Sequence, residues 1–154
     1  MKGKIMLTEE QVKGMNWNKS IVLKIEKIWN SKYTEQLHRQ IVADMIDNEL
    51  ILNDSILDAG SGSGEVYKYL KQHLEKKNVS YMGIDGSLEF LKLSRQKFPE
   101  AQFELQILYE LTLNNIFDVV FCIDVLQHCN YYEQVIKELF KVTKRVLMLR
   151  TWVH

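Results

Sequence analysis

The first segment that could do chemistry is a run of alternate glycines, Gly60, Gly62 and Gly64, which follows the apolar stretch Ser55–Ala59. Glycine lacks a Cβ, so the backbone can turn sharply here and let a ligand lie against the main chain. An amphipathic stretch follows, and the N–H groups in the first turn of the helix that it predicts face the same ligand. The dinucleotide pattern Gly-x-Gly-x-x-Gly would need glycine where Glu65 stands. The loop therefore predicts a nucleotide-like ligand and points away from NAD.

A second candidate is the carboxylate of Asp85, the last residue of the apolar run Ser80–Asp85. In a parallel sheet, the end of this strand lies beside the glycine loop. An acid at such a position can accept hydrogen bonds from both hydroxyls of a ribose. Because several nucleoside cofactors share this feature, Asp85 alone predicts a nucleoside without saying which one.

The segments that must position these groups alternate between strand and helix patterns. We expect strands at 55–59, 80–85, 101–106, 117–122 and 145–150, and helices at 65–76, 87–98 and 132–141. Repeated strand–helix units predict an α/β fold with a doubly wound, mainly parallel sheet and helices on both faces. Ligand sites in such sheets lie at the carboxyl ends of the strands, and the first and fourth strands should flank the switch point.

The segment 1–50 is predicted to be helical and to form a cap or lid, while 51–154 is predicted to form the α/β core of the same globular unit. A capping-box pattern is present at Thr8–Gln11, and a helical pattern follows Asn18. A second helix follows Thr34, with one predicted apolar face made of Leu37, Ile41, Met45 and Ile46.

Four segments resemble, in order and spacing, motifs of the class I S-adenosylmethionine-dependent methyltransferases. Ile56–Gly64 is similar to the first motif of that family, Gly83–Ser87 to its second, Phe117–Cys122 to its fourth strand and Val125–His128 to the loop after it. The resemblance implies a Rossmann-like sheet with strand order 3-2-1-4-5 and S-adenosylmethionine as the cofactor. It also implies methyl transfer to O, N or C of a small-molecule acceptor, with S-adenosylhomocysteine as the product.

The same resemblance assigns cofactor contacts to individual residues. They are Asp58 for the amino group of the cofactor, Gly60, Ser61 and Gly62 for its methionine part, Asp85 for the ribose, Gly86 and Ser87 for the border of the adenine, and Ile123 at the end of the fourth strand. Many relatives place an acid for the adenine amine after the third strand. This chain has Gln106 there, whose side-chain oxygen could accept the same bond, unless Ile107 stands at that position.

His128 is the candidate catalytic residue, because relatives meet both cofactor and acceptor at the loop after the fourth strand. A neutral imidazole there could take a proton from an acceptor hydroxyl or amine near pH 7. Packing beside the cofactor is the alternative role, since methyl transfer from a sulfonium needs chiefly alignment and exclusion of water. Asp124 in the same loop is a second candidate.

The N-terminal helices of relatives commonly form a lid over the cofactor. Arg39 could meet the carboxylate of the cofactor, and an aromatic ring could cover the sulfonium. We expect Tyr33, at the break between the two helices, to be that ring. Trp29 continues the apolar stripe of its own helix, so we expect it to pack in the core.

Composition limits the partners. The 154 residues include 20 basic and 20 acidic side chains, so no global field favours nucleic acid or an anionic membrane, and a cytoplasmic protein is expected. Cys122 and Cys129 predict neither a disulfide framework nor a metal site. Relatives continue past the fifth strand with an antiparallel hairpin. The sequence ends at His154 without one, so we expect an open fifth-strand edge that could form a homodimer.

Two alternatives remain open at this point. One is a binding module or pseudo-enzyme that keeps the cofactor site but needs a partner for turnover. The other is an NAD-dependent oxidoreductase or nucleotide-sugar enzyme, which Glu65 and the absence of a Tyr-x-x-x-Lys pair disfavour.

Overall fold

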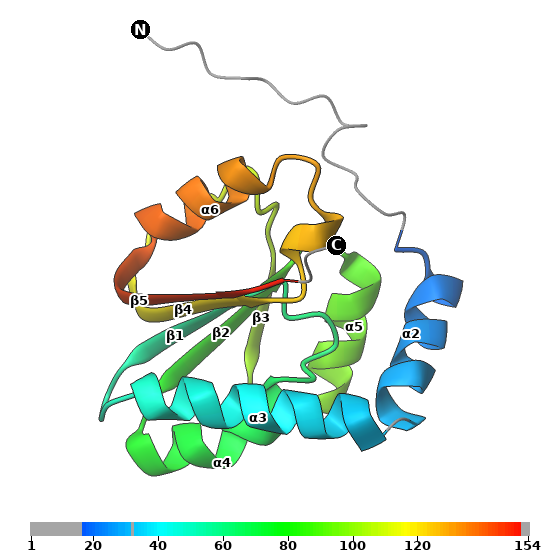
Figure 1. Cartoon of the computed structure of the whole chain (residues 1–154), viewed down its shortest axis with the longest axis horizontal. Coiled ribbons are helices and arrows are strands. Elements are labelled where there is room, and N and C mark those ends of the chain that lie inside the picture. Colours follow the sequence, from blue (N-terminus) through cyan, green and yellow to red (C-terminus); the bar gives the residue numbers. More distant parts are fainter. Residues whose placement is uncertain (1–16, 32, 152–154) are drawn as a thin grey trace, which may run out of the picture.

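A five-stranded parallel sheet forms the centre of the molecule (Figure 1). The computed structural model describes residues 17–31 and 33–151. The strand order is β3-β2-β1-β4-β5, which confirms the predicted order, and β1 lies between β2 and β4 at the switch point. The strands are β1 (Ser55–Ala59), β2 (Ser80–Asp85), β3 (Gln102–Leu105), β4 (Phe117–Ile123) and β5 (Thr143–Arg150).

Helices cover both faces of this sheet, as a doubly wound fold requires. Figure 1 shows α3 and α4 on one face and α6 on the other, with α2 lying outside α5. The helices are α2 (Lys19–Ser31), α3 (Tyr33–Glu49), α4 (Tyr67–Lys77), α5 (Leu88–Lys97), the short 3-10 turn η1 (Leu126–His128) and α6 (Tyr132–Lys141). The capping-box pattern at Thr8–Gln11 lies outside the described residues.

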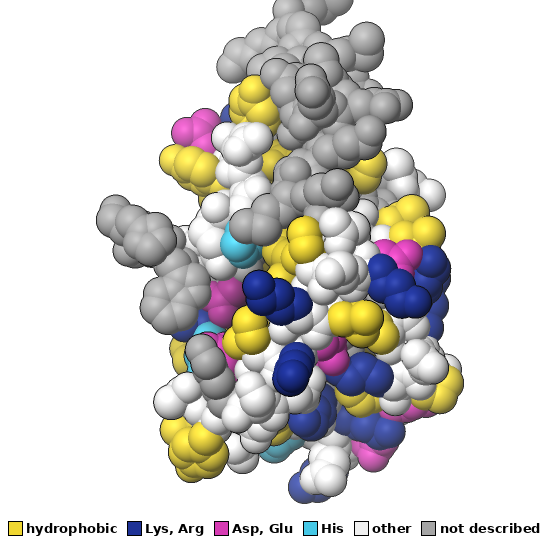
Figure 2. Space-filling view, turned by 90° about the vertical axis from the view of Figure 1, so that its right-hand side faces the viewer, with side chains coloured by type: hydrophobic (Ala, Val, Ile, Leu, Met, Phe, Trp, Pro, Cys, Tyr) yellow, Lys and Arg dark blue, Asp and Glu magenta, His cyan; other side chains and the backbone are white. Residues whose placement is uncertain are grey.

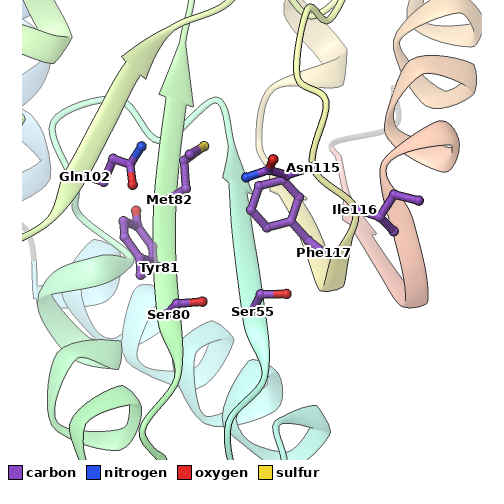
Figure 3. Close-up of a pocket in the computed structure, with 8 residues that line it drawn as sticks. All are labelled: Ser55, Ser80, Tyr81, Met82, Gln102, Asn115, Ile116 and Phe117. Atoms are coloured by element: carbon purple, nitrogen blue, oxygen red, sulfur yellow. The ribbon is translucent and has the colours of Figure 1, made fainter.

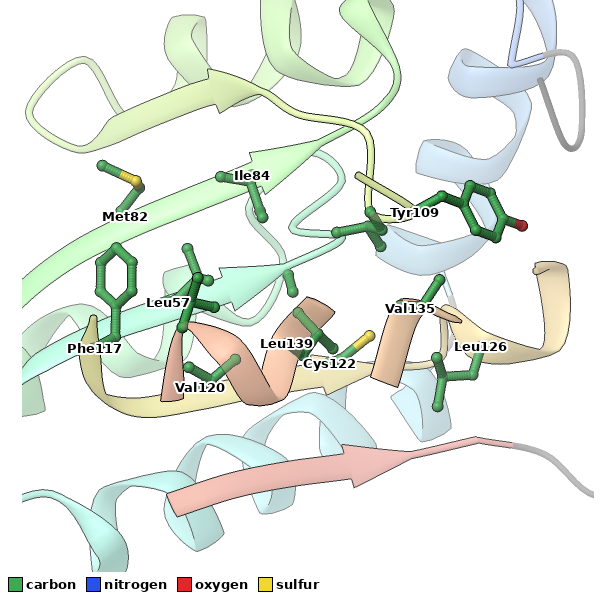
Figure 4. Close-up of a cluster of buried hydrophobic side chains, with 13 residues drawn as sticks. Leu57, Met82, Ile84, Tyr109, Phe117, Val120, Cys122, Leu126, Val135 and Leu139 are labelled. Carbon is green, nitrogen blue, oxygen red and sulfur yellow. The ribbon is translucent and has the colours of Figure 1, made fainter. Parts of the chain in front are cut away.

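Two hydrophobic clusters, one on each face, hold the layers together. Along β4 the side chains alternate: Val119 and Phe121 pack with α3 and α4, while Val120 and Cys122 pack with α6. Figure 4 shows the α6 cluster, where Leu139 of that helix lies over the strands. A strand buried on both faces must be apolar at nearly every position, which is why the pattern of this strand could be read from the sequence.

The predicted apolar face of α3 is only partly correct. Ile46 is fully buried, but Leu37, Ile41 and Met45 are 41%, 49% and 53% exposed. The helix instead buries a face that includes Val42, Ala43 and Arg39, because its rotation is set by packing on the sheet and on α4. Apolar residues on two sides of a helix do not by themselves say which side is inside.

Strand β5 is the edge strand and pairs with β4 alone among the strands of the described chain. It begins at Thr143, two residues earlier than expected, because the hydroxyl of Thr143 donates to the carbonyl of Leu139 and joins the strand directly to the end of α6. A dimer through this edge stays a prediction.

Candidate cofactor and acceptor site

A cavity of about 720 Å³ lies at the carboxyl ends of the strands. Its walls come from the glycine loop, from residues after β2, β3 and β4, and from Trp17 and Trp29 of the N-terminal region. A second hollow of about 380 Å³ lies at the opposite, amino-terminal edge of the sheet (Figure 3). No acid, lysine, arginine or histidine among the described residues lines this second hollow. Since doubly wound sheets bind ligands at the carboxyl ends, the larger cavity is the candidate site.

The glycine loop folds back onto β2 and forms the floor of the cavity. The N–H groups of Gly60 and Ser61 both donate to the carbonyl of Ile84, at 2.8 and 2.9 Å. Gly60 has φ +84°, a conformation that side chains resist, and a Cβ there would overlap the side chain of Val125. The cavity floor is therefore bare backbone, the surface that a flat or extended ligand needs.

Asp85 joins this loop to the turn that follows β2. One carboxylate oxygen accepts from the N–H of Gly62 at 2.9 Å and the other from the N–H of Ser87 at 2.7 Å. Burial raises the pKa of this carboxyl, while the backbone hydrogen bonds oppose that rise. Asp85, Gly86 and Ser87 all line the cavity, so the remaining lone pairs of the carboxylate can accept ribose hydroxyls. Ser87 also caps α5 as predicted, accepting from Phe90 N–H at 3.3 Å.

Asp58 and Ser61 lie beneath the loop and do not line the cavity. The Asp58 carboxylate is buried and accepts a hydrogen bond from the hydroxyl of Tyr81 at 2.8 Å. Burial raises its pKa to about 7, with the Tyr81 hydrogen bond opposing and the charge of Asp85 adding to the rise. Ser61 turns its buried Oγ toward Gly83, away from the cavity. These side chains support the loop from below, and the structure places neither at the ligand surface.

On the adenine side of the expected site, Ile107 lines the cavity and Gln106 does not. The side-chain oxygen of Gln106 is taken by Thr112, whose N–H and hydroxyl donate to it at 3.2 and 3.0 Å. Of the two alternatives left by the sequence, the structure thus favours Ile107. Ile123 does not line the cavity either, because it packs against the α3 and α4 cluster.

The loop after β4 brings Asp124 and His128 to the cavity wall. Burial lowers the pKa of His128, although the charge of Asp124 opposes this, so the ring is neutral near pH 7. The ring of Trp17 meets that of His128 edge-on, with centroids 5.7 Å apart. Asp124 has φ +57° and forms an ion pair with Arg150, the last residue of β5.

The N-terminal helices supply an aromatic wall, but not through the expected residue. Tyr33 is 76% exposed and does not line the cavity. Trp29 does line it, stacked on Phe90 with centroids 5.8 Å apart and planes at 12°. Arg39 is buried and does not line the cavity, so the structure does not bring it to the wall where the cofactor carboxylate was expected. Its guanidinium pairs with Glu35 at 3.1 Å and lies 4.7 Å from the centre of the Trp29 ring. The expectation that Trp29 packs in the core is therefore revised, because Trp29 lines the cavity. The apolar stripe of α2 does not turn inward as a whole, since Ile21 and Ile28 are 38% and 39% exposed.

An ion cluster fixes α2 to the site. Lys97 of α5 contacts both carboxylate oxygens of Glu26 on α2 at 3.2 Å and also pairs with Glu65, just after the glycine loop. The hydroxyl of Ser63 in the loop donates to Glu26 as well. Because the side chain of Glu65 is only 7% exposed, this cluster lies in a protected setting where partners matter.

We expect Lys97→Met to lower the free energy of unfolding by about 2 kcal/mol, because it leaves two protected carboxylates without their cation. Urea denaturation measures this. The matched control is Lys92→Met on the same helix, whose pair with Glu89 is exposed and should contribute less than about 0.5 kcal/mol. Equal losses in both variants would contradict the role given to Lys97.

Metal ligands, cysteine thiols and long apolar helices would each indicate another kind of site or surface. No group of three His, Cys, Asp or Glu side chains within 17–31 and 33–151 is placed to hold a metal ion. Burial raises the pKa of both cysteine thiols, Cys122 and Cys129. In the part of the chain that the structure describes, no helix is long and apolar enough to span a membrane.

Comparison with known proteins also relates the chain to methyltransferases. A family model described as a methyltransferase domain matches residues 57–146, more than half of the chain. An uncharacterized protein of Methanocaldococcus jannaschii is 40% identical over 76 residues, which cover 49% of this chain and 30% of that protein. A carboxy-S-adenosyl-L-methionine synthase of Desulfotalea psychrophila is 36% identical over 58 residues, which cover 38% of this chain and 24% of the synthase.

Among solved structures, an amino pentose methyltransferase of Micromonospora echinaspora with bound S-adenosylmethionine is similar, with a TM-score of 0.65 and 18% identity. The match covers 86% of this chain and 56% of that enzyme, so the chain spans less than two thirds of each of these proteins. At this identity the likeness concerns the fold. Together with the family model, the strand order and the glycine loop, it shows that the chain belongs to the class I S-adenosylmethionine-dependent methyltransferase family.

Proposed function

We propose that this chain binds S-adenosylmethionine in the 720 Å³ cavity and transfers its methyl group to O, N or C of a small molecule. The observation that carries the proposal is the Asp85 carboxylate, bonded to Gly62 N–H of a bare glycine loop at the carboxyl ends of the strands. The residues present fit the cofactor, because Gly62, whose φ of +54° favours glycine, leaves bare backbone on the cavity wall beside the Asp85 carboxylate. When bound, S-adenosylmethionine supplies a methyl group on a positively charged sulfur.

The residues of the chain divide the remaining work. Asp85 holds hydroxyls through its free lone pairs, and the rings of Trp29 and Phe90 keep water from one wall. Alignment of two reactants in such a site provides much of the rate acceleration. His128, neutral near pH 7, can accept a proton at a ring nitrogen when the acceptor carries one.

A small molecule is the preferred acceptor for two reasons. The chain carries no net charge, and Figure 2 shows basic and acidic side chains intermixed on the face of α2 and α5. On α5, Lys97 and Lys92 are each paired with a glutamate. A nucleic acid would favour a continuous basic surface. The amino pentose methyltransferase with a similar fold also acts on a small molecule.

A thermal-denaturation titration with S-adenosylhomocysteine tests the cofactor. At a ligand concentration one hundred times the Kd, we expect a stabilisation of about 2.7 kcal/mol, which raises the Tm. NAD is the comparison ligand and should give no shift. No shift with millimolar S-adenosylhomocysteine would overturn the proposal, and a shift with NAD alone would favour an oxidoreductase. Binding without turnover across acceptor panels would favour the pseudo-enzyme.

A further inference from the structure

The charged groups on the cavity wall are all acidic. Asp85, Glu89 and Asp124 line it, and no lysine or arginine does so among the residues that the structure describes. Carboxylates of one sign in a partly enclosed space create a field that attracts cations and repels anions. An anionic acceptor, such as a carboxylate or a phosphate, would find no lysine or arginine on this wall among the described residues.

The three acidic side chains differ in the partners that they already bind. Asp85 is held by two backbone N–H groups on the β2 side of the loop. Glu89 at the start of α5 pairs with Lys92 at 2.7 Å. Asp124 follows β4, and the order β2-β1-β4 places the whole glycine loop between Asp85 and Asp124. Asp124 is therefore the acid available at the other end of the cavity, beside His128.

Contacts from β5 fix Asp124 without enclosing it. Its N–H donates to the carbonyl of Arg150 at 2.9 Å, and one guanidinium nitrogen of Arg150 contacts both carboxylate oxygens, at 3.1 and 2.9 Å. Gln127 donates to the Asp124 carbonyl at 2.8 Å. Each carboxylate oxygen has two lone pairs, and the side chain is 25% exposed, so acceptor capacity remains. Arg150 does not line the cavity, so a ligand meets the acid and not its cation.

The neighbours of Asp124 suit a nitrogen cation. The imidazole of His128 lies on the same wall, and the Trp17 ring packs against it at 5.7 Å. Aromatic faces attract ammonium groups, and Trp17 also meets Phe90 at 5.5 Å to form an apolar corner. A carboxylate, a proton acceptor and an aromatic wall thus stand together at one end of the cavity.

We infer that the acceptor is an amine, whose ammonium form is held by Asp124 and deprotonated by His128. The inference rests on the proposed methyl transfer. An R–NH₃⁺ group gives one proton to a ring nitrogen of His128, and the lone pair that is freed forms the new N–C bond as the C–S bond breaks. The sulfur leaves as a neutral thioether, the product is R–NH₂⁺–CH₃, and the imidazolium returns its proton to water.

The test uses the full chain saturated with S-adenosylhomocysteine and three probes of similar size, 2-phenylethylamine, 2-phenylethanol and 3-phenylpropanoate, by calorimetric titration. The phenyl ring suits the Trp17 and Phe90 corner. We expect the amine to bind at least tenfold more tightly than the alcohol, and the carboxylate to bind least. In the presence of S-adenosylmethionine, the amine should also give S-adenosylhomocysteine faster than the alcohol does.

Asp124→Asn should remove the preference for the amine, because asparagine keeps the shape and tolerates φ +57° but carries no charge. Glu133→Gln is the matched control, an exposed acid on α6 that does not line the cavity. Equal binding of amine and alcohol, no binding of any probe, or an amine preference that survives in Asp124→Asn would overturn the amine assignment. Failure of S-adenosylhomocysteine itself to bind would instead overturn the proposed function, so the two failures are distinguishable.

Discussion

Replacing Asp58 by asparagine is expected to stabilise the protein at pH 8. Burial raises the pKa of this carboxyl from 3.8 to about 7, so the folded state prefers its neutral form. Because the pKa is raised on folding, the contribution of Asp58 to the free energy of unfolding is fully present below pH 4 and is lost as the pH rises through about 7. The loss amounts to about 4 kcal/mol, and asparagine, which can still accept from Tyr81, avoids it.

The new amide group of asparagine needs a partner of its own, which costs about 1 kcal/mol, so a net gain of about 3 kcal/mol is expected at pH 8. Urea denaturation measures the free energy of unfolding at pH 5 and at pH 8. The difference between these two values should be smaller in the variant than in the parent protein. Asp118→Asn is the control, and it should lower the free energy of unfolding at pH 8. Lys144 and Ser55 hold the pKa of the Asp118 carboxyl below its usual value, so its ionised form stabilises the folded state. A variant at Asp58 that is less stable at pH 8 than the parent would show that the buried group is ionised.

The second large effect is expected at the ribose carboxylate. Asp85→Asn should weaken S-adenosylhomocysteine binding by about 100-fold, because a neutral amide loses two charge-assisted acceptors for hydroxyls. In the parent protein, the N–H groups of Gly62 and Ser87 each donate to one oxygen of the Asp85 carboxylate. In the variant, the amide NH₂ group would face one of these two N–H donors. Calorimetric titration measures the change in Kd.

The control for Asp85 is Glu104→Gln, which removes a negative charge from β3 without touching the cavity wall and should leave the Kd within twofold. If Asp85→Asn binds S-adenosylhomocysteine as tightly as the parent protein, the ribose assignment is wrong. A fall in stability alone, without a change in Kd, would place Asp85 among the residues that only shape the loop.

Local patterns allowed the core of the site to be predicted. Gly60, Asp85 and Ser87 are fixed by the strands that immediately precede them, so motif spacing was enough to bring them to the cavity. The parallel sheet then follows from alternating apolar segments, since each buried strand needs a covering helix before the next one. The strand order came from the resemblance to a known family.

Features that depend on helix rotation and long-range packing could not be predicted in the same way. Trp29 and Tyr33 are four positions apart, yet only the packing of α2 on α5 determines that Trp29 reaches the cavity. The cluster of Glu26, Glu65 and Lys97 joins residues up to 71 positions apart. The sequence shows Trp29 three positions after Glu26. No local pattern indicates that these two residues contact α5 and the cavity. The side-chain direction of Ser61 likewise depends on the space left by Gly83.

The Glu26 and Lys97 contact has a consequence for the timing of ligand exchange. Helix α2 carries both Glu26 and the cavity-lining Trp29, so a movement of this helix away from α5 opens the wall and breaks the ion pair together. Dissolved salt screens such a pair, which is 15% to 30% exposed, more strongly than it weakens the stacked rings. The residence time of a bound cofactor should therefore shorten as ionic strength rises, and the dissociation rate becomes a property that the salt content of the surroundings can adjust.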